Sequence, residues 1–193
     1  DLLTDYKHAI DMHHIGEEIL VHYSRAGKEG SINLKAEKAR DNYSLVKGEQ
    51  FDRTPQYYIY GGILFVPLNM NLIKRWGSDW ARSAPVSLLK MRNEWSSPER
   101  QEVVVALQVL AGDVNLGYHD WRNWVVESVN GKQVKDFQQF ANLLKKNLED
   151  NVVFENKNGY QMVINHDKAM ESENTILSQY RIPAAHSAAL FSN

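Results

Sequence analysis

The stretch YYIYGGILFVP, residues 57–67, places two adjacent glycines between an aromatic and an aliphatic segment. Glycine adopts positive φ at little steric cost and lets other groups approach the backbone closely. The β-prone run Ile63–Val66 that follows predicts a buried strand. Two interpretations of the glycine pair stay open. It is either a tight turn before a core strand, or a loop whose N–H groups hold a peptide carboxylate while the adjoining strand edge pairs with that peptide.

The composition is that of an ordinary globular protein. Of the 193 residues, 43% are hydrophobic and 24% are charged, and 22 basic residues face 24 acidic ones for a net charge of −2. No basic block stands out, so we do not expect a nucleic-acid partner. The apolar runs are far shorter than the ~20 residues that span a bilayer, so we expect no membrane insertion. The absence of cysteine excludes disulfides and thiolate metal sites.

The N-terminal part of the chain predicts one helix and one hairpin. Helical spacing covers residues 2–13, alternation covers residues 18–25, and a second β-type run covers residues 31–36. These elements bury too little apolar surface to fold well alone. The chain also begins with Asp1 rather than Met. We therefore expect a fragment or a processed chain in which residues 1–45 are the end of a truncated domain and residues 46–54 are a linker.

The remainder, residues 55–193, predicts one complete domain of mixed α and β structure. A Trp-rich region at about residues 68–100 favours short helices that form an insertion. Asn130-Gly131 is the strongest short turn signal in the chain. Asp136 is a suitable N-cap for a helix with a broad apolar face. The elements expected in this part are strands at residues 102–110, 125–129, 152–155 and 161–164, and helices at residues 136–146 and 168–180.

Catalytic and metal-binding motifs are lacking. No serine lies in a G-x-S-x-G or G-N-S-G-G setting, so nucleophilic acyl transfer has no candidate. His8, His13 and His14 lack the carboxylate pattern of a metal site. We therefore expect no catalytic residue, no metal and no cofactor. The tryptophans fit core or interface packing better than a stacking platform, because basic residues are not interleaved with them.

Four blocks of sequence resemble one protease family. They are Pro55–Leu68 with its G-G-hydrophobic-x-F-x-P-L pattern, Val103–Tyr118 with V-V-V-x-x-Q-V-L-A and N-x-G-Y, the V-N-G turn at Val129–Gly131, and Ile176–Leu190 with I-L-x-x-Y-x-I-P. Together they resemble the C-terminal PDZ region of protease Do-like serine proteases, the HtrA/Deg family, in its plant-type Deg branch. Residues 16–34 resemble the end of a preceding PDZ domain.

The resemblance implies a fold and a set of ligand-binding residues. The fold would be an α+β, PDZ-like, partly open β-barrel or sandwich capped by helices and preceded by the tail of another PDZ-like domain. The implied carboxylate-binding loop is Tyr60, Gly61, Gly62 and Ile63, the implied peptide-pairing strand is Ile63, Leu64, Phe65 and Val66, and the implied groove walls are Phe137, Phe140 and Leu144.

Two hypotheses on function follow from the resemblance. The first is a non-catalytic peptide-binding and regulatory region of a serine endopeptidase in protein quality control, with peptides or unfolded segments and other subunits of the same homo-oligomer as partners. The second is a closed-groove module that assembles protease subunits without binding peptide. A periplasmic, other extracytoplasmic or organellar compartment is implied by the resemblance alone.

Overall fold

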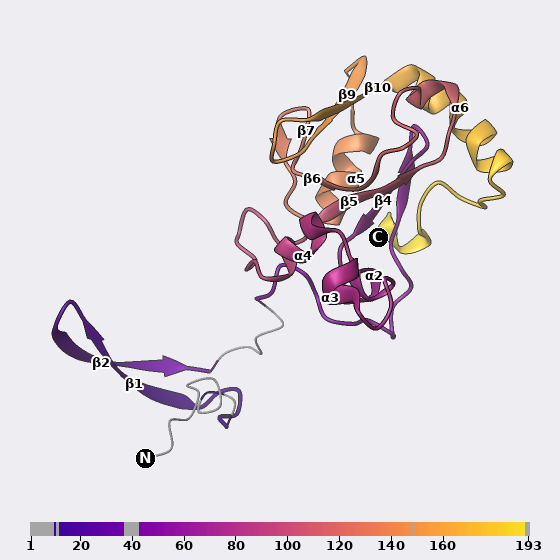
Figure 1. Ribbon diagram of the computed structural model, residues 1–193. Helices are drawn as coiled ribbons and strands as arrows, with labels where there is room; N and C mark the ends of the chain where they lie inside the picture. The colour runs from indigo at the N-terminus through magenta and orange to yellow at the C-terminus, as the bar shows by residue number, and fades with distance from the viewer. Residues whose placement is uncertain (1–9, 11, 37–42, 148, 192–193) are drawn as a thin grey trace. The chain divides into compact units, whose positions relative to one another are not determined.

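The computed structural model describes residues 10, 12–36, 43–147 and 149–191 (Figure 1). The chain divides into two compact units, Asp1–Tyr43 and Ser44–Asn193. None of the helices in the described residues has the length and apolar character needed to cross a membrane.

The first unit contains a β-hairpin. Strands β1 (Glu18–Arg25) and β2 (Lys28–Lys35) pair antiparallel across the whole of their length. The pairs Ile19↔Leu34 and Val21↔Ile32 place four apolar side chains on one face of this ribbon. Both predicted strands are confirmed, whereas the helix expected over residues 2–13 lies mostly outside the described residues. That this unit is the end of a truncated PDZ-like domain stays a prediction.

The second unit contains two four-stranded antiparallel sheets. The first sheet has the order β3 (Tyr58–Tyr60), β4 (Ile63–Pro67), β5 (Val104–Val109) and β6 (Arg122–Val126). The second has the order β10 (Gln161–Asn165), β9 (Asn151–Glu155), β7 (Ser128–Val129) and β8 (Lys132–Gln133). The helices α5 (Phe137–Lys145) and α6 (His166–Gln179) complete a partly open β-sandwich, which is the predicted fold class (Figure 1).

The main core lies where these sheets and α5 meet. Phe65 of β4 packs with its ring centroid 4.8 Å from those of both Phe140 of α5 and Phe154 of β9. All three side chains are fully buried. Burying large aromatic rings in one cluster contributes strongly to stability, so this trio ties the two sheets together.

The Trp-rich insertion forms the short helices expected from its sequence. They are α2 (Met70–Lys74), α3 (Trp80–Ser83) and α4 (Val86–Arg92). Their apolar side chains form a second core cluster with the outer face of the first sheet. Leu45 and Val46 are buried in this cluster, and the N–H of Leu45 donates to the carbonyl of Glu94. The second unit thus begins before the glycine-hinged strand.

Candidate functional site

The glycine pair is a two-residue hairpin turn. Gly61 and Gly62 have φ of +55° and +79°, and the residues on either side, Tyr60 and Ile63, are paired across β3 and β4. Positive φ at both central positions defines the type I′ turn that matches the twist of a hairpin. The tight-turn interpretation of the sequence therefore describes the backbone conformation.

A buried asparagine holds this turn in place. Asn115, in the short 3₁₀ helix η2 (Asp113–Asn115), is fully buried. Its side-chain amide donates to the carbonyls of Gly61 at 2.8 Å and Leu110 at 2.9 Å, and its Oδ1 accepts from the N–H of Gly112 at 3.0 Å. The side chains of Ile164 and Ala169 cover Gly61. Asn115, Ile164 and Ala169 therefore pack against the turn, and a carboxylate could reach the two glycines only if these side chains moved.

The other residues named from the sequence also lie in closed surroundings. Strand β4 is paired with β3 on one edge and with β5 on the other. The proposed groove walls Phe137, Phe140 and Leu144 belong to the main core. Tyr60, Ile63 and Phe65 belong to the same core, whereas Leu64 and Val66 are half-buried and pack against the two other clusters. A ligand role for this whole set stays a prediction that requires a more open state.

The outer edge of β3 carries the C-terminal segment of the chain. The N–H of Ile59 donates to the carbonyl of Ala185 at 2.6 Å, and the N–H of Ser187 donates to the carbonyl of Tyr57 at 3.0 Å. The Ser187 hydroxyl also accepts from the N–H of Tyr57 at 3.3 Å. Tyr58 and His186 form an antiparallel bridge. We call residues 183–187 the tail strand, because Ala185–Ser187 pair with residues 57–59 in the manner of an added antiparallel strand.

The tail strand lies in a groove with a helical wall. A hollow of about 390 Å³ remains beside it, lined by Tyr58 on the strand side and by Glu173, Asn174 and Leu177 of α6 on the other. Past the tail strand, the short helix η3 (Ala188–Leu190) places Leu190 in the main core. A strand edge facing a helix is the arrangement in which an extended peptide gains main-chain hydrogen bonds and side-chain pockets together.

Burial of Tyr58 in this groove gives the unit an alkaline pH dependence. Burial, with a smaller contribution from the Glu173 carboxylate, raises the pKa of Tyr58 to about 12. Because the pKa is higher in the folded state, Tyr58 contributes stability that is complete below its unfolded pKa of about 10 and is lost as pH rises through about 12. We expect the free energy of unfolding to fall across this range, measured by urea titration at successive pH values.

The variant Tyr58→Phe should flatten this part of the profile, since phenylalanine has no proton to lose. Tyr160→Phe, at a 64% exposed side chain, is the control and should leave the profile unchanged. Equal alkaline profiles for wild type and Tyr58→Phe would contradict the assignment. Burial also raises the pKa of Tyr60, so ionisation of Tyr60 contributes a further fall in the free energy of unfolding at alkaline pH.

Sequence reasoning missed both strand β3 and the tail strand. The aromatic run before the glycines was a usable signal, because tyrosine and isoleucine favour strands. The described residues contain no group of three or more metal-ligating side chains.

Comparisons with known proteins assign a family to most of the second unit. The family model described as "PDZ domain" matches residues 46–189. Protease Do-like 4, mitochondrial, from Arabidopsis thaliana is 30% identical over 182 residues, which are 94% of this chain and 32% of that protein. Protease Do-like 2, chloroplastic, from the same plant is 27% identical over 96% of this chain and 30% of its own length. A serine protease DegP homolog of Plasmodium falciparum (isolate 3D7) is 23% identical over 83% of this chain. The chain thus spans about a third of the length of its plant relatives.

Proposed function

The chain belongs to the PDZ domain family, in the form found in Do-like proteases, and on that premise we propose that it binds extended polypeptide segments by strand addition at the outer edge of β3. In this proposal the tail strand occupies the peptide position in the resting state. Binding a substrate segment displaces the tail strand and so couples recognition to a change in the surface of the unit.

One observation carries the proposal: the chain's own tail strand is held at β3 as a ligand would be. The main-chain bonds Ile59–Ala185 and Ser187–Tyr57 use groups that every peptide has. The main-chain carbonyl of Ala184 also accepts from the Tyr57 hydroxyl at 3.1 Å, and Ala185 packs against the cluster that contains Ile59. Main-chain bonds give affinity in this binding mode, and side-chain pockets give specificity. The edge is therefore suited to accept other extended segments.

The wider role extends to the protein that carries this region. We propose that the region regulates a Do-like serine endopeptidase in protein quality control by recognising unfolded segments. Other subunits of the same protein are proposed as further partners, in a homo-oligomer housed in an organellar or extracytoplasmic compartment. The basis for these statements is the similarity to Do-like proteases over the PDZ region.

A second candidate function is favoured by the pairing around β3 and β4 in the first sheet. Because β4 is paired on both sides and the tail strand covers β3, the unit in this state has a closed groove. A closed module would serve assembly of protease subunits rather than peptide capture. In that case the unit should associate as its concentration rises and bind no peptide.

Loosening the tail strand should expose the site, and Ser187→Pro is the variant suited to this. Ser187 has φ of −64°, which proline adopts without strain, but proline lacks the N–H that donates to Tyr57. The probe is a fluorescent peptide copying residues 182–190, IPAAHSAAL, with an amidated C-terminus. An attached segment competes at an effective concentration in the millimolar range, so we expect at least ~tenfold tighter binding to the variant than to wild type.

Ser187→Ala is the matched control, because it keeps the N–H and removes only the hydroxyl; it should have a smaller effect. Anisotropy titrations with the free-acid form of the same peptide locate the site. Equal affinity for acid and amide is expected at β3, whereas binding of the acid alone would move the site to the glycine turn. Absence of binding to a folded Ser187→Pro variant would refute strand addition and favour the closed module.

A further inference from the structure

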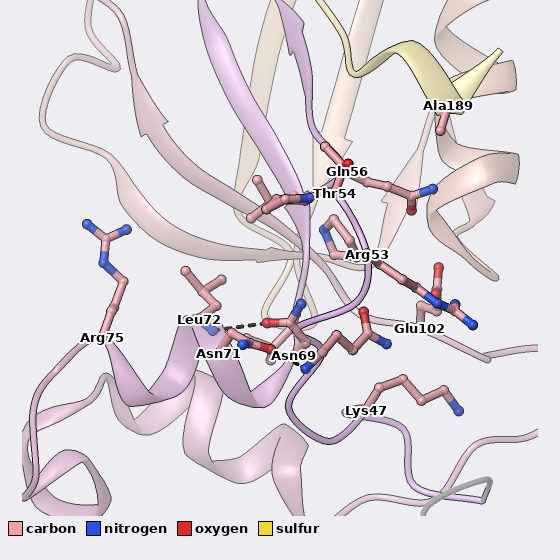
Figure 2. Close-up of a pocket in the computed structure, with 15 residues that line it drawn as sticks. Lys47, Arg53, Thr54, Gln56, Asn69, Asn71, Leu72, Arg75, Glu102 and Ala189 are labelled. Carbon is pink, nitrogen blue, oxygen red and sulfur yellow. Dashed lines mark hydrogen bonds between the residues drawn. The ribbon is translucent and has the colours of Figure 1, made fainter. Parts of the chain in front are cut away.

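A second hollow lies at the Pro67 end of β4, and Ala189, just past the tail strand, forms part of its lining. Its volume is about 580 Å³, within the range of ligand sites in proteins. Its apolar floor comes from the end of β4 and from α2 and includes Val66, Pro67 and Leu72. Figure 2 shows the segment from Lys47 to Gln56 along one side of it.

The walls of this hollow are held by hydrogen bonds. Asn69 caps α2 by accepting from the N–H of Leu72 at 2.9 Å, as the dashed line in Figure 2 marks. Asn71 accepts from the N–H of Gln50 at 2.7 Å, which ties the flanking segment to the helix. The N–H of Met70 donates to the carbonyl of Lys47 at 3.0 Å. The hollow is thus a formed feature rather than a gap between loose loops.

The charges around the hollow are mostly positive. Lys47, Arg53 and Arg75 line it, against a single carboxylate, Glu102. That carboxylate accepts from the N–H of Phe137 at 2.9 Å, at the start of α5, where the positive end of the helix already balances part of its charge. In the described part of the chain, Arg53 and Arg75 have no ion pair. Arg53 and Arg75 therefore present positive charge at the hollow beside apolar surface.

The positions of the cations indicate the shape of the ligand. Figure 2 shows Arg75 beyond Leu72 on one side of the hollow, and Lys47 and Arg53 on the other. An extended segment with an apolar centre and carboxylates toward both ends could place the centre on the floor and the carboxylates near the arginines. Guanidinium groups bind carboxylates well because their donors form a planar fork.

We propose that this hollow is a second peptide-binding site that takes acidic, partly apolar extended segments. It shares no lining residue with the hollow beside the tail strand, and it differs from that hollow in chemistry. Recognition here depends on charge and an apolar floor, whereas the β3 groove depends on main-chain pairing. A protein with both sites would favour polypeptide segments in which a strand-forming run is followed or preceded by acidic residues.

The test compares two fluorescent amidated peptides of equal length, EDLVDE and QNLVNQ, which differ only in charge. We expect EDLVDE to bind the whole chain at least ~tenfold more tightly than QNLVNQ, and its binding to weaken as added salt screens the exposed arginines. Arg53→Gln and Arg75→Gln should each weaken EDLVDE by about two- to fivefold, the usual range for exposed ion pairs.

Arg122→Gln, at an exposed arginine of β6 outside the hollow, is the matched control and should leave the affinity unchanged. Equal affinities for the two peptides, or an equal loss in Arg122→Gln, would overturn the proposal in favour of non-specific charge attraction. Arg75→Gln should not alter binding of the IPAAHSAAL peptide to Ser187→Pro. That comparison separates a failure at this site from a failure of strand addition at β3.

Discussion

Replacement of Gly62 by valine is expected to remove a large part of the folding free energy of the second unit. Gly62 has φ of +79°, a conformation that costs an L-residue about 1–2 kcal/mol and a β-branched one more. A Cβ atom there would lie 2.4 Å from the Asn115 Nδ2 and 2.5 Å from the Leu110 carbonyl oxygen. The second atom is backbone and cannot swing aside.

Overpacking of a tight core site typically costs about 1–3 kcal/mol in addition to the backbone strain. The sum, about 2–5 kcal/mol, is a large part of the ~5–15 kcal/mol by which folded domains are stable. Urea unfolding followed by circular dichroism measures the loss.

Gly159→Val supplies the matched control for this experiment. Gly159 has φ of +77°, almost the same as Gly62, but a Cβ there would meet no atom within 4 Å. Gly159→Val therefore introduces the same backbone strain as Gly62→Val but no steric clash. We expect it to lose only about 1–2 kcal/mol, with an unchanged fold. Similar losses in the two variants would show that the packing around Gly62 is not as tight as the geometry requires.

The second large effect is expected for Asn115→Leu. Leucine nearly matches asparagine in size, but it leaves the carbonyls of Gly61 and Leu110 and the N–H of Gly112 without this partner. An unsatisfied buried polar group costs about 1–3 kcal/mol, so the variant should lose about 3 kcal/mol or more. The measurement is again urea unfolding.

Asn158→Leu, at an exposed turn residue, is the control and should change stability by less than about 0.5 kcal/mol. A neutral Asn115→Leu variant would mean that water or a backbone shift replaces the asparagine bonds. Gly62→Val and Asn115→Leu both disturb the packing between Asn115 and the glycine turn, so their losses of folding free energy should not be additive.

The local elements could be predicted from the sequence because they depend on local patterns. The hairpin of the first unit, the strand Ile63–Pro67 and the helix Phe137–Lys145 lie where alternation, glycine and an N-cap placed them. The apolar face of that helix was also recognised. A pattern of this kind shows that a face is buried but not what covers it, so it could not distinguish a groove wall from the core that Phe137 and Phe140 in fact form.

The features that close the site depend on distant pairs. Asn115 reaches Gly61 across 54 positions, and Tyr57 meets Ser187 across 130. No periodicity within a short window carries such information. The tail strand was missed for the same reason, whereas β3 pairs locally with β4 and its aromatic run was a signal within the sequence.

The long separation between β3 and the tail strand also fixes when the groove is completed as the chain is made. Ribosomes add about 5–20 residues per second, so roughly 10 s pass between the synthesis of Tyr57 and that of Ser187. During that interval β3 has hydrogen-bonding groups on its outer edge and no tail strand to pair with them. Open strand edges recruit other extended chains. The nascent unit is therefore most exposed to mispairing at the very edge that the tail strand will cover.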